Sequence, residues 1–168
     1  KEIEPSTMNR DLNLISNVFK YARRWRMMTH NPMTDLMRPK DPEPRNRRIS
    51  DQEIEQLLVA LNYSDDQPIT AQRQKVAIAF LVALETAMRQ GEPARVKWSD
   101  VHLDERYVFL PHTITKTAVS RNVPLSARAI KLIQRLERTK ETMLGVSAGV
   151  VSTMFRKAVA DCAIDNLT

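Results

Sequence analysis

The chain has 168 residues, and its 26 Lys and Arg against 20 Asp and Glu give a net charge of +6 and a pI of about 9.7. A length near that of one domain and 42% hydrophobic residues allow a folded core, and the basic balance favours a polyanionic partner such as nucleic acid. The single cysteine, Cys162, excludes an internal disulfide. The longest apolar run, residues 76–84, falls short of the ~20 residues that span a bilayer. We therefore expect a cytoplasmic protein without a membrane partner.

The first predicted element is a helix that starts near residues 5–7 and ends before Asn31-Pro32. Apolar residues at spacings of four and three line one face of it: Met8, Leu12, Ile15, Phe19 and Ala22. The following stretch, residues 38–48, holds three prolines and more cations than acids. Proline opposes regular helix and charge opposes burial, so we predict a domain boundary in this stretch.

Two further helices are predicted after this boundary. Ser50 and Glu53 have the spacing of a capping box, and a buried stripe follows them: Ile54, Leu57, Leu58 and Leu61. The next helix, at about residues 71–88, is apolar on nearly all sides over residues 76–84. Such a pattern is typical of a central helix inside a core.

The hydrophobic pattern then changes to that of strands. Residues 107–110 and 121–124 indicate a small antiparallel sheet, and Ser126 and Ser147 are placed to cap a fourth and a fifth helix. The predicted fold class is therefore mainly α with a small antiparallel β-sheet, an α+β arrangement.

The stretch with the most functional information is residues 84–92, in which Arg89 directly follows the buried helix and Glu92 follows three residues later. Downstream come W-S-D-V at residues 98–101, T-K at residues 115–116 and S-R-N-V-P-L-S at residues 120–126. This order closely resembles the tyrosine recombinase family of phage-type integrases and their relatives, including shufflon-type invertases. The family pattern is roughly T-G-x-R-x-x-E, W-x-D-[IV], T-K and S-R-x-V-P-L-S. Two departures are Ala87 in place of the common glycine and Pro93 in place of Leu or Ile.

The resemblance covers residues 7–168 and implies a domain organisation. Residues 1–40 correspond to the C-terminal helices of a core-binding, SAM-like DNA-binding domain, residues 41–48 to a linker, and residues 49–168 to the N-terminal part of the catalytic domain. The implied fold is that of the tyrosine-recombinase catalytic core in incomplete form.

The resemblance implies that Arg89 is the first catalytic arginine and that Lys116 is the hairpin lysine that protonates the departing 5′ oxygen. Phosphoryl transfer in this family uses no metal, so side chains neutralise the charge on the non-bridging oxygens. A guanidinium offers a fixed fork of donors, and a desolvated ammonium can release a proton. From position alone, both residues also fit solvated surface charges.

Other polar residues receive weaker assignments. We expect Glu92 to hold a basic group or a helix end in position without contacting the reacting groups. An equal alternative is that Glu92 is an acid at the start of a helix, where the helix dipole favours negative charge. The candidate DNA contacts are Arg23, Arg24, Arg47, Arg48 and Arg121. Each also fits a solvated charge, but together they predict strongly salt-dependent DNA binding. One cysteine and three scattered histidines argue against a zinc site, and no cofactor is expected.

The family's H-x-x-R motif and its nucleophilic tyrosine have no counterpart in the sequence. Three histidines are present, and none has arginine three residues later: His30, His102 and His112. The three tyrosines all precede the position where the nucleophile belongs: Tyr21, Tyr63 and Tyr107. We therefore expect a chain truncated before the nucleophile, which cannot itself cleave DNA.

The resemblance implies that the intact parent carries out site-specific recombination or integration. It would cleave and rejoin double-stranded DNA at specific sites through a 3′-phosphotyrosyl intermediate, with four protomers acting together. A different reading of the same charge and helices is a non-catalytic basic DNA-binding module, and a third is a basic helical scaffold that binds no DNA.

Overall fold

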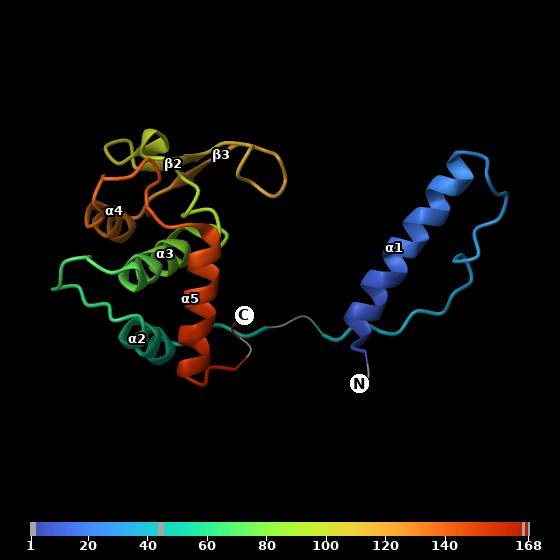
Figure 1. Cartoon of the computed structure of the whole chain (residues 1–168), viewed down its shortest axis with the longest axis horizontal. Coiled ribbons are helices and arrows are strands. Elements are labelled where there is room, and N and C mark those ends of the chain that lie inside the picture. Colours follow the sequence, from blue (N-terminus) through green and yellow to red (C-terminus); the bar gives the residue numbers. More distant parts are fainter. Residues whose placement is uncertain (1–2, 44–45, 166, 168) are drawn as a thin grey trace. The chain divides into compact units, whose positions relative to one another are not determined.

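The computed structural model describes residues 3–43, 46–165 and 167, and the chain divides into two compact units, Lys1–Asn46 and Arg47–Thr168 (Figure 1). The boundary lies in the proline-rich stretch, directly before Arg47. None of the helices in the described ranges combines the length and apolar character that a bilayer crossing requires.

The first unit consists of helix α1, Pro5–Arg24, and a segment that returns along it. The Asn9 side-chain amide donates to the Pro39 carbonyl at 2.9 Å and to Asp41 Oδ1 at 2.7 Å. The predicted apolar stripe of α1 is incompletely covered, since Met8 and Ile15 are 41% and 43% exposed. Among the described residues of this unit, 3–43 and 46, only the irregular segment after α1 can cover the helix, which explains why the stripe is incompletely buried.

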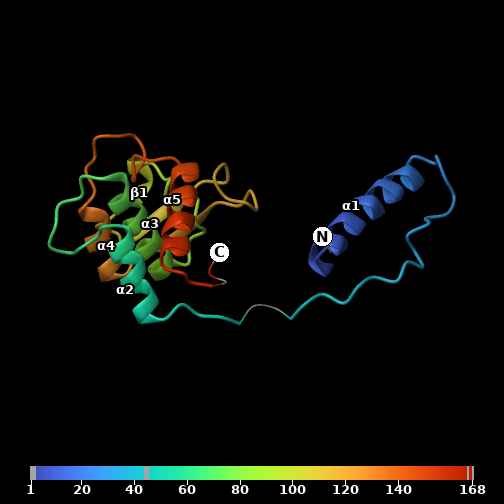
Figure 2. The same ribbon diagram turned by 60° about the horizontal axis from the view of Figure 1, so that its bottom comes forward.

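In the described part of the second unit, residues 47–165 and 167, there are four α-helices: α2, Asp51–Ala60; α3, Gln72–Thr86; α4, Ala127–Gln134; and α5, Ala148–Asp161. The predicted capping box is confirmed, because Ser50 Oγ accepts from the Glu53 amide and Glu53 accepts from the Ser50 amide. Ser126 and Ser147 cap α4 and α5 as predicted. Helix α3 lies between α4 and α5 in both views and is buried over most of its surface, as its apolar run predicts (Figures 1 and 2).

A three-stranded antiparallel sheet lies between α3 and α4 in the chain. The strands β1, Val101–His102, β2, Tyr107–Leu110, and β3, Arg121–Pro124, are ordered β1-β2-β3, after a short 3-10 helix η1, Trp98–Asp100. The two strands predicted from sequence are confirmed, and β1 is an addition to them. On β2, Val108 and Leu110 are fully buried, so one face of the sheet covers the core and positions the β2–β3 hairpin above it.

Helix α3 is followed by a strained C-cap residue, Ala87, two positions before Arg89. Ala87 has φ 52° and ψ 25°, the left-handed conformation in which a side chain is disfavoured and glycine is not. We expect Ala87→Gly to raise the free energy of unfolding by about 1 kcal/mol, because this cap strain exceeds the entropic cost of glycine. Urea unfolding of the two proteins measures the difference, and a lower midpoint for the glycine variant would contradict this account.

Candidate phosphate-binding site

A surface hollow of about 370 Å³ lies between the turns that follow α3 and the loop that joins β2 to β3. Arg89 enters it from the α3 side and Lys116 from the hairpin loop, so the two cations with predicted catalytic roles line the same hollow. The full lining is Arg89, Gly91, Glu92, Arg95, Thr113, Ile114, Thr115 and Lys116. Three of these side chains are cations, and the arrangement suits a polyanion.

Glu92 is the buried acid of the site, with only 2% of its surface exposed. Its Oε2 accepts from the Arg89 backbone amide at 2.8 Å and from Arg121 Nη2 at 2.7 Å, and its Oε1 accepts from Arg89 Nη1 at 3.2 Å. Burial raises the pKa of this carboxyl, but the hydrogen bonds from Arg89 and Arg121 outweigh burial and hold the pKa below its ordinary value. Glu92 therefore remains a carboxylate that holds two arginines.

Arg121, predicted as a DNA contact, lies on β3 and reaches back to Glu92 instead of lining the hollow. Its side chain is 35% exposed, so part of it remains accessible. The ion pair joins the β3 end of the hairpin to the turn that carries Arg89. Arg121 thus orients the two halves of the site relative to each other through Glu92.

The hairpin loop that presents Lys116 is held closed by its own hydrogen bonds. Thr115 is buried, and its hydroxyl lies 3.2 Å from the His112 carbonyl and 3.0 Å from the Val119 carbonyl. The His112 amide donates to Ser120 Oγ at 2.9 Å, which closes the base of the loop. Lys116 itself is exposed, so this hydrogen-bonded loop presents a solvated ammonium.

The remaining predicted DNA contacts are spread over both units. Arg47 forms an ion pair with Glu53, which partly neutralises its charge, and Arg48 is exposed. In the first unit, three cations near the end of α1, Lys20, Arg23 and Arg24, line a separate hollow of about 390 Å³ together with Ser16 and Asn31. Arg23 and Arg24 thus belong to a second cationic surface, whose role in binding DNA stays a prediction.

Sequence reasoning missed Arg95, which also lines the hollow. Two successive turns bring it back toward Arg89: the Glu92 amide donates to the Arg89 carbonyl at 2.8 Å, and the Arg95 amide donates to the Glu92 carbonyl at 2.9 Å. The sequence does show a cation six residues after Arg89, but this spacing indicates that the two side chains are close only once the two turns are known.

None of the three tyrosines lines the hollow. Tyr63 donates to Asp65 at 2.9 Å, and burial, followed by this hydrogen bond, raises the pKa of its hydroxyl to about 12. The Tyr107 ring stacks on His102 with centroids 4.5 Å apart, and Tyr21 lies on α1 in the other unit. The Tyr63 and Tyr107 side chains are thus engaged in contacts away from the hollow.

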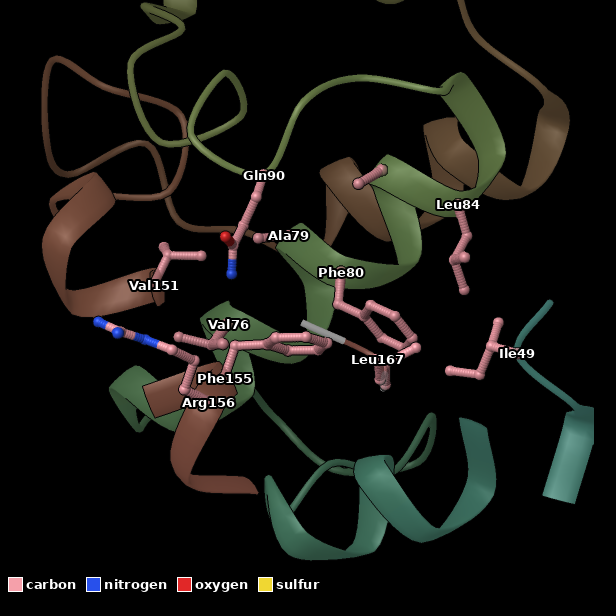
Figure 3. A pocket seen from close by; sticks show the side chains of 11 residues that line it. Ile49, Val76, Ala79, Phe80, Leu84, Gln90, Val151, Phe155, Arg156 and Leu167 are labelled. Carbon is pink, nitrogen blue, oxygen red and sulfur yellow. The ribbon is translucent and has the colours of Figure 1, made fainter. Parts of the chain in front are cut away.

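A second hollow in the same unit, of about 410 Å³, has the opposite chemistry (Figure 3). It lies between α3 and α5, where the Phe80 and Phe155 rings pack with centroids 5.1 Å apart. Gln90 and Arg156 are the polar side chains among its otherwise apolar lining. Few donors are available there for a phosphate, so this hollow suits a polyanion less well than the hollow lined by Arg89 and Lys116.

Residues 47–158, which include this site, match the model of the phage integrase family. The chain belongs to that family. One relative, an integrase/recombinase of Haemophilus influenzae, is 39% identical to the chain over 142 residues, which cover 83% of the chain and 38% of the relative. A shufflon-specific DNA recombinase of Escherichia coli is 33% identical over 137 residues, which cover 81% of the chain and 33% of the relative. The chain spans a third to two fifths of the length of these two relatives.

A solved structure shares the fold of this integrase-family chain. The structure of a lambda integrase tetramer bound to a Holliday junction superposes with a TM-score of 0.64 at 21% identity, over 98% of the chain and 54% of the lambda integrase chain. This similarity confirms the predicted fold class, and the family match confirms the resemblance to tyrosine recombinases.

Proposed function

We propose that this chain supplies the phosphate-binding part of a site-specific DNA recombinase that acts on double-stranded DNA. The observation that carries the proposal is the presence of Arg89 and Lys116 in one hollow, with Arg89 held by a buried carboxylate. Glu92 engages Arg89 through one Nη atom and the backbone, and half of the side chain remains exposed for a ligand. The guanidinium can therefore donate to a phosphate while it stays fixed in place.

In the proposed reaction, a tyrosine hydroxyl releases its proton to solvent and its oxygen attacks the phosphorus, so that a P–O bond to the tyrosine forms and the P–O5′ bond breaks. Arg89 stabilises the charge on the non-bridging oxygens, and Lys116 transfers a proton to the departing 5′ oxygen. Attack by a 5′ hydroxyl reverses these steps, so the number of phosphodiester bonds is conserved. Association of several protomers on DNA is part of the proposal, and lambda integrase, which shares the fold, is a tetramer on a Holliday junction.

The nucleophile is not Tyr21, Tyr63 or Tyr107 in this proposal, because the hollow is lined by none of them. We expect the 168-residue chain to bind duplex DNA without forming a covalent adduct. Detection of an SDS-resistant protein–DNA species with this chain would contradict that expectation.

The domain roles are proposed on the same family basis: residues 1–40 form a core-binding part and residues 49–168 form a catalytic part. A cytoplasmic location is also proposed, because the proposed substrate is DNA.

Duplex binding tests the phosphate-binding role. We expect the affinity for a fluorescent duplex, measured by anisotropy between 50 and 200 mM salt (about a fourfold range), to fall linearly on a log–log plot, with a slope of about −0.9 for each phosphate neutralised. Arg89→Gln and Lys116→Gln should each make the slope shallower by about 0.9, since each removes one phosphate contact.

Matched controls for these two variants are Arg73→Gln and Lys157→Gln, which remove exposed cations outside the hollow. Their slopes should stay close to that of the wild type. Salt-independent binding of the wild type, or equal losses in the site variants and the controls, would overturn the proposed function.

A further inference from the structure

Arg95 is the third cation of the hollow, and its guanidinium lies against the backbone at Gly91. An added Cβ at Gly91 would lie 3.9 Å from both Cζ and Nη2 of Arg95, so the guanidinium lies directly over this glycine. Gly91 is two residues from Arg89 and also lines the hollow. The Arg95 head group therefore lies against Gly91 in the same hollow as Arg89, although the side chain as a whole is exposed.

The charge of Arg95 is not neutralised inside the hollow. Glu92 is the one acid in the lining, and both of its carboxylate oxygens are already occupied by Arg89 and Arg121. Over residues 3–43, 46–165 and 167, the Arg95 side chain makes no ion pair and donates no hydrogen bond. Its full set of donors is thus available to an anion that enters the hollow.

Duplex DNA presents more than one phosphate to such a surface, because it carries a charge for every ~1.7 Å of helix axis. We propose that Arg95 is a further DNA-binding residue of this site and contacts the backbone phosphate next to the one bound by Arg89 and Lys116. This inference rests on the proposed function. Arg95 positions the strand and leaves the proton transfer and the charge stabilisation at the reacting phosphate to Lys116 and Arg89.

Arg95→Gln, with Arg95→Lys beside it, tests the assignment in the full chain. We expect the glutamine variant to make the salt slope of duplex binding shallower by about 0.9, the value for one lost phosphate contact. The lysine variant retains the charge and should restore the slope. Arg73→Gln is the matched control, an exposed arginine outside the hollow, and its slope should equal that of the wild type.

Thermal unfolding of each variant shows that the comparison is made on folded protein, as expected for an exposed side chain. If the wild type binds with a salt slope that Arg89→Gln reduces, while Arg95→Gln leaves it unchanged, the Arg95 inference fails and the proposed function stands. An equal reduction in Arg73→Gln would also overturn the inference, because the loss would then reflect net charge alone. If the wild type shows no salt-dependent binding, the proposed function fails first.

Discussion

Replacement of Glu92 by glutamine is expected to lower the free energy of unfolding by about 2–3 kcal/mol. The amide nearly preserves the shape of the side chain but removes the charge that Arg89 and Arg121 share. One of its two acceptor positions becomes a donor that faces a guanidinium. The loss stays below the ~3–5 kcal/mol of a fully buried pair, because water reaches the Arg89 and Arg121 side chains, which are 50% and 35% exposed.

The pH dependence of stability should identify this carboxylate. Its pKa is depressed in the folded protein, so its contribution is complete above the ordinary glutamate pKa of about 4.3 and is lost as the pH falls through the folded value. The difference in stability between wild type and Glu92→Gln should therefore be constant near pH 6–8, roughly, and should shrink below about pH 4.

Urea unfolding across this pH range measures the difference between the two proteins. Glu55→Gln serves as the control, because Glu55 is exposed on α2 and its removal should change stability by less than about 0.5 kcal/mol. A Glu92→Gln variant as stable as the wild type at neutral pH would show that the two arginines do not depend on this carboxylate.

Leu110→Ala is expected to be the most destabilising of the proposed substitutions, at about 3 kcal/mol. Leu110 ends β2 and is fully buried, so the shorter side chain loses hydrophobic contact and leaves a cavity. It also pairs with Arg121 across the hairpin, directly before the loop that carries Lys116. Domains of this size are stable by only about 5–15 kcal/mol, so the change should be evident as a large fall in the urea midpoint.

Leu84→Ala is the matched control for this substitution. Leu84 lies on α3 and is 45% exposed, so the same chemical change should cost less than about 1 kcal/mol. Equal losses for the two variants would show that the hairpin face of the sheet is not the tightly packed core that the fold indicates.

The predictable parts of this fold are those encoded by residues close together in the sequence. Ser50 and Glu53 predicted the start of α2, because a capping box involves only residues three apart. The all-round apolar run of α3 predicted its central position for the same reason. Strand β1 has two residues, too few to show an alternation, and was not expected.

In the site, too, the features encoded by short motifs were predictable, and the contacts that depend on the tertiary fold were not. The motif order predicted Arg89 and Lys116, and the structure places both in one hollow. Sequence reasoning expected Glu92 to brace a basic group but could not select Arg121, which lies 29 residues away and reaches Glu92 only through the β2–β3 register. Arg95 depends on two consecutive turns and on the absence of a side chain at Gly91, and neither produces a periodic pattern.

The hydrogen bonds of Thr115 and Ser120 have a consequence for the thermodynamics of association. Ordering one backbone residue costs about 1–2 kcal/mol in conformational entropy, so a mobile loop of this length would lose much of any electrostatic gain when it settled on a ligand. Here the loop backbone is already held by these hydrogen bonds, and within the loop an incoming anion has only the Lys116 side chain to immobilise, at about 0.5–1.5 kcal/mol. The preorganised loop therefore favours a tighter complex without any additional contact.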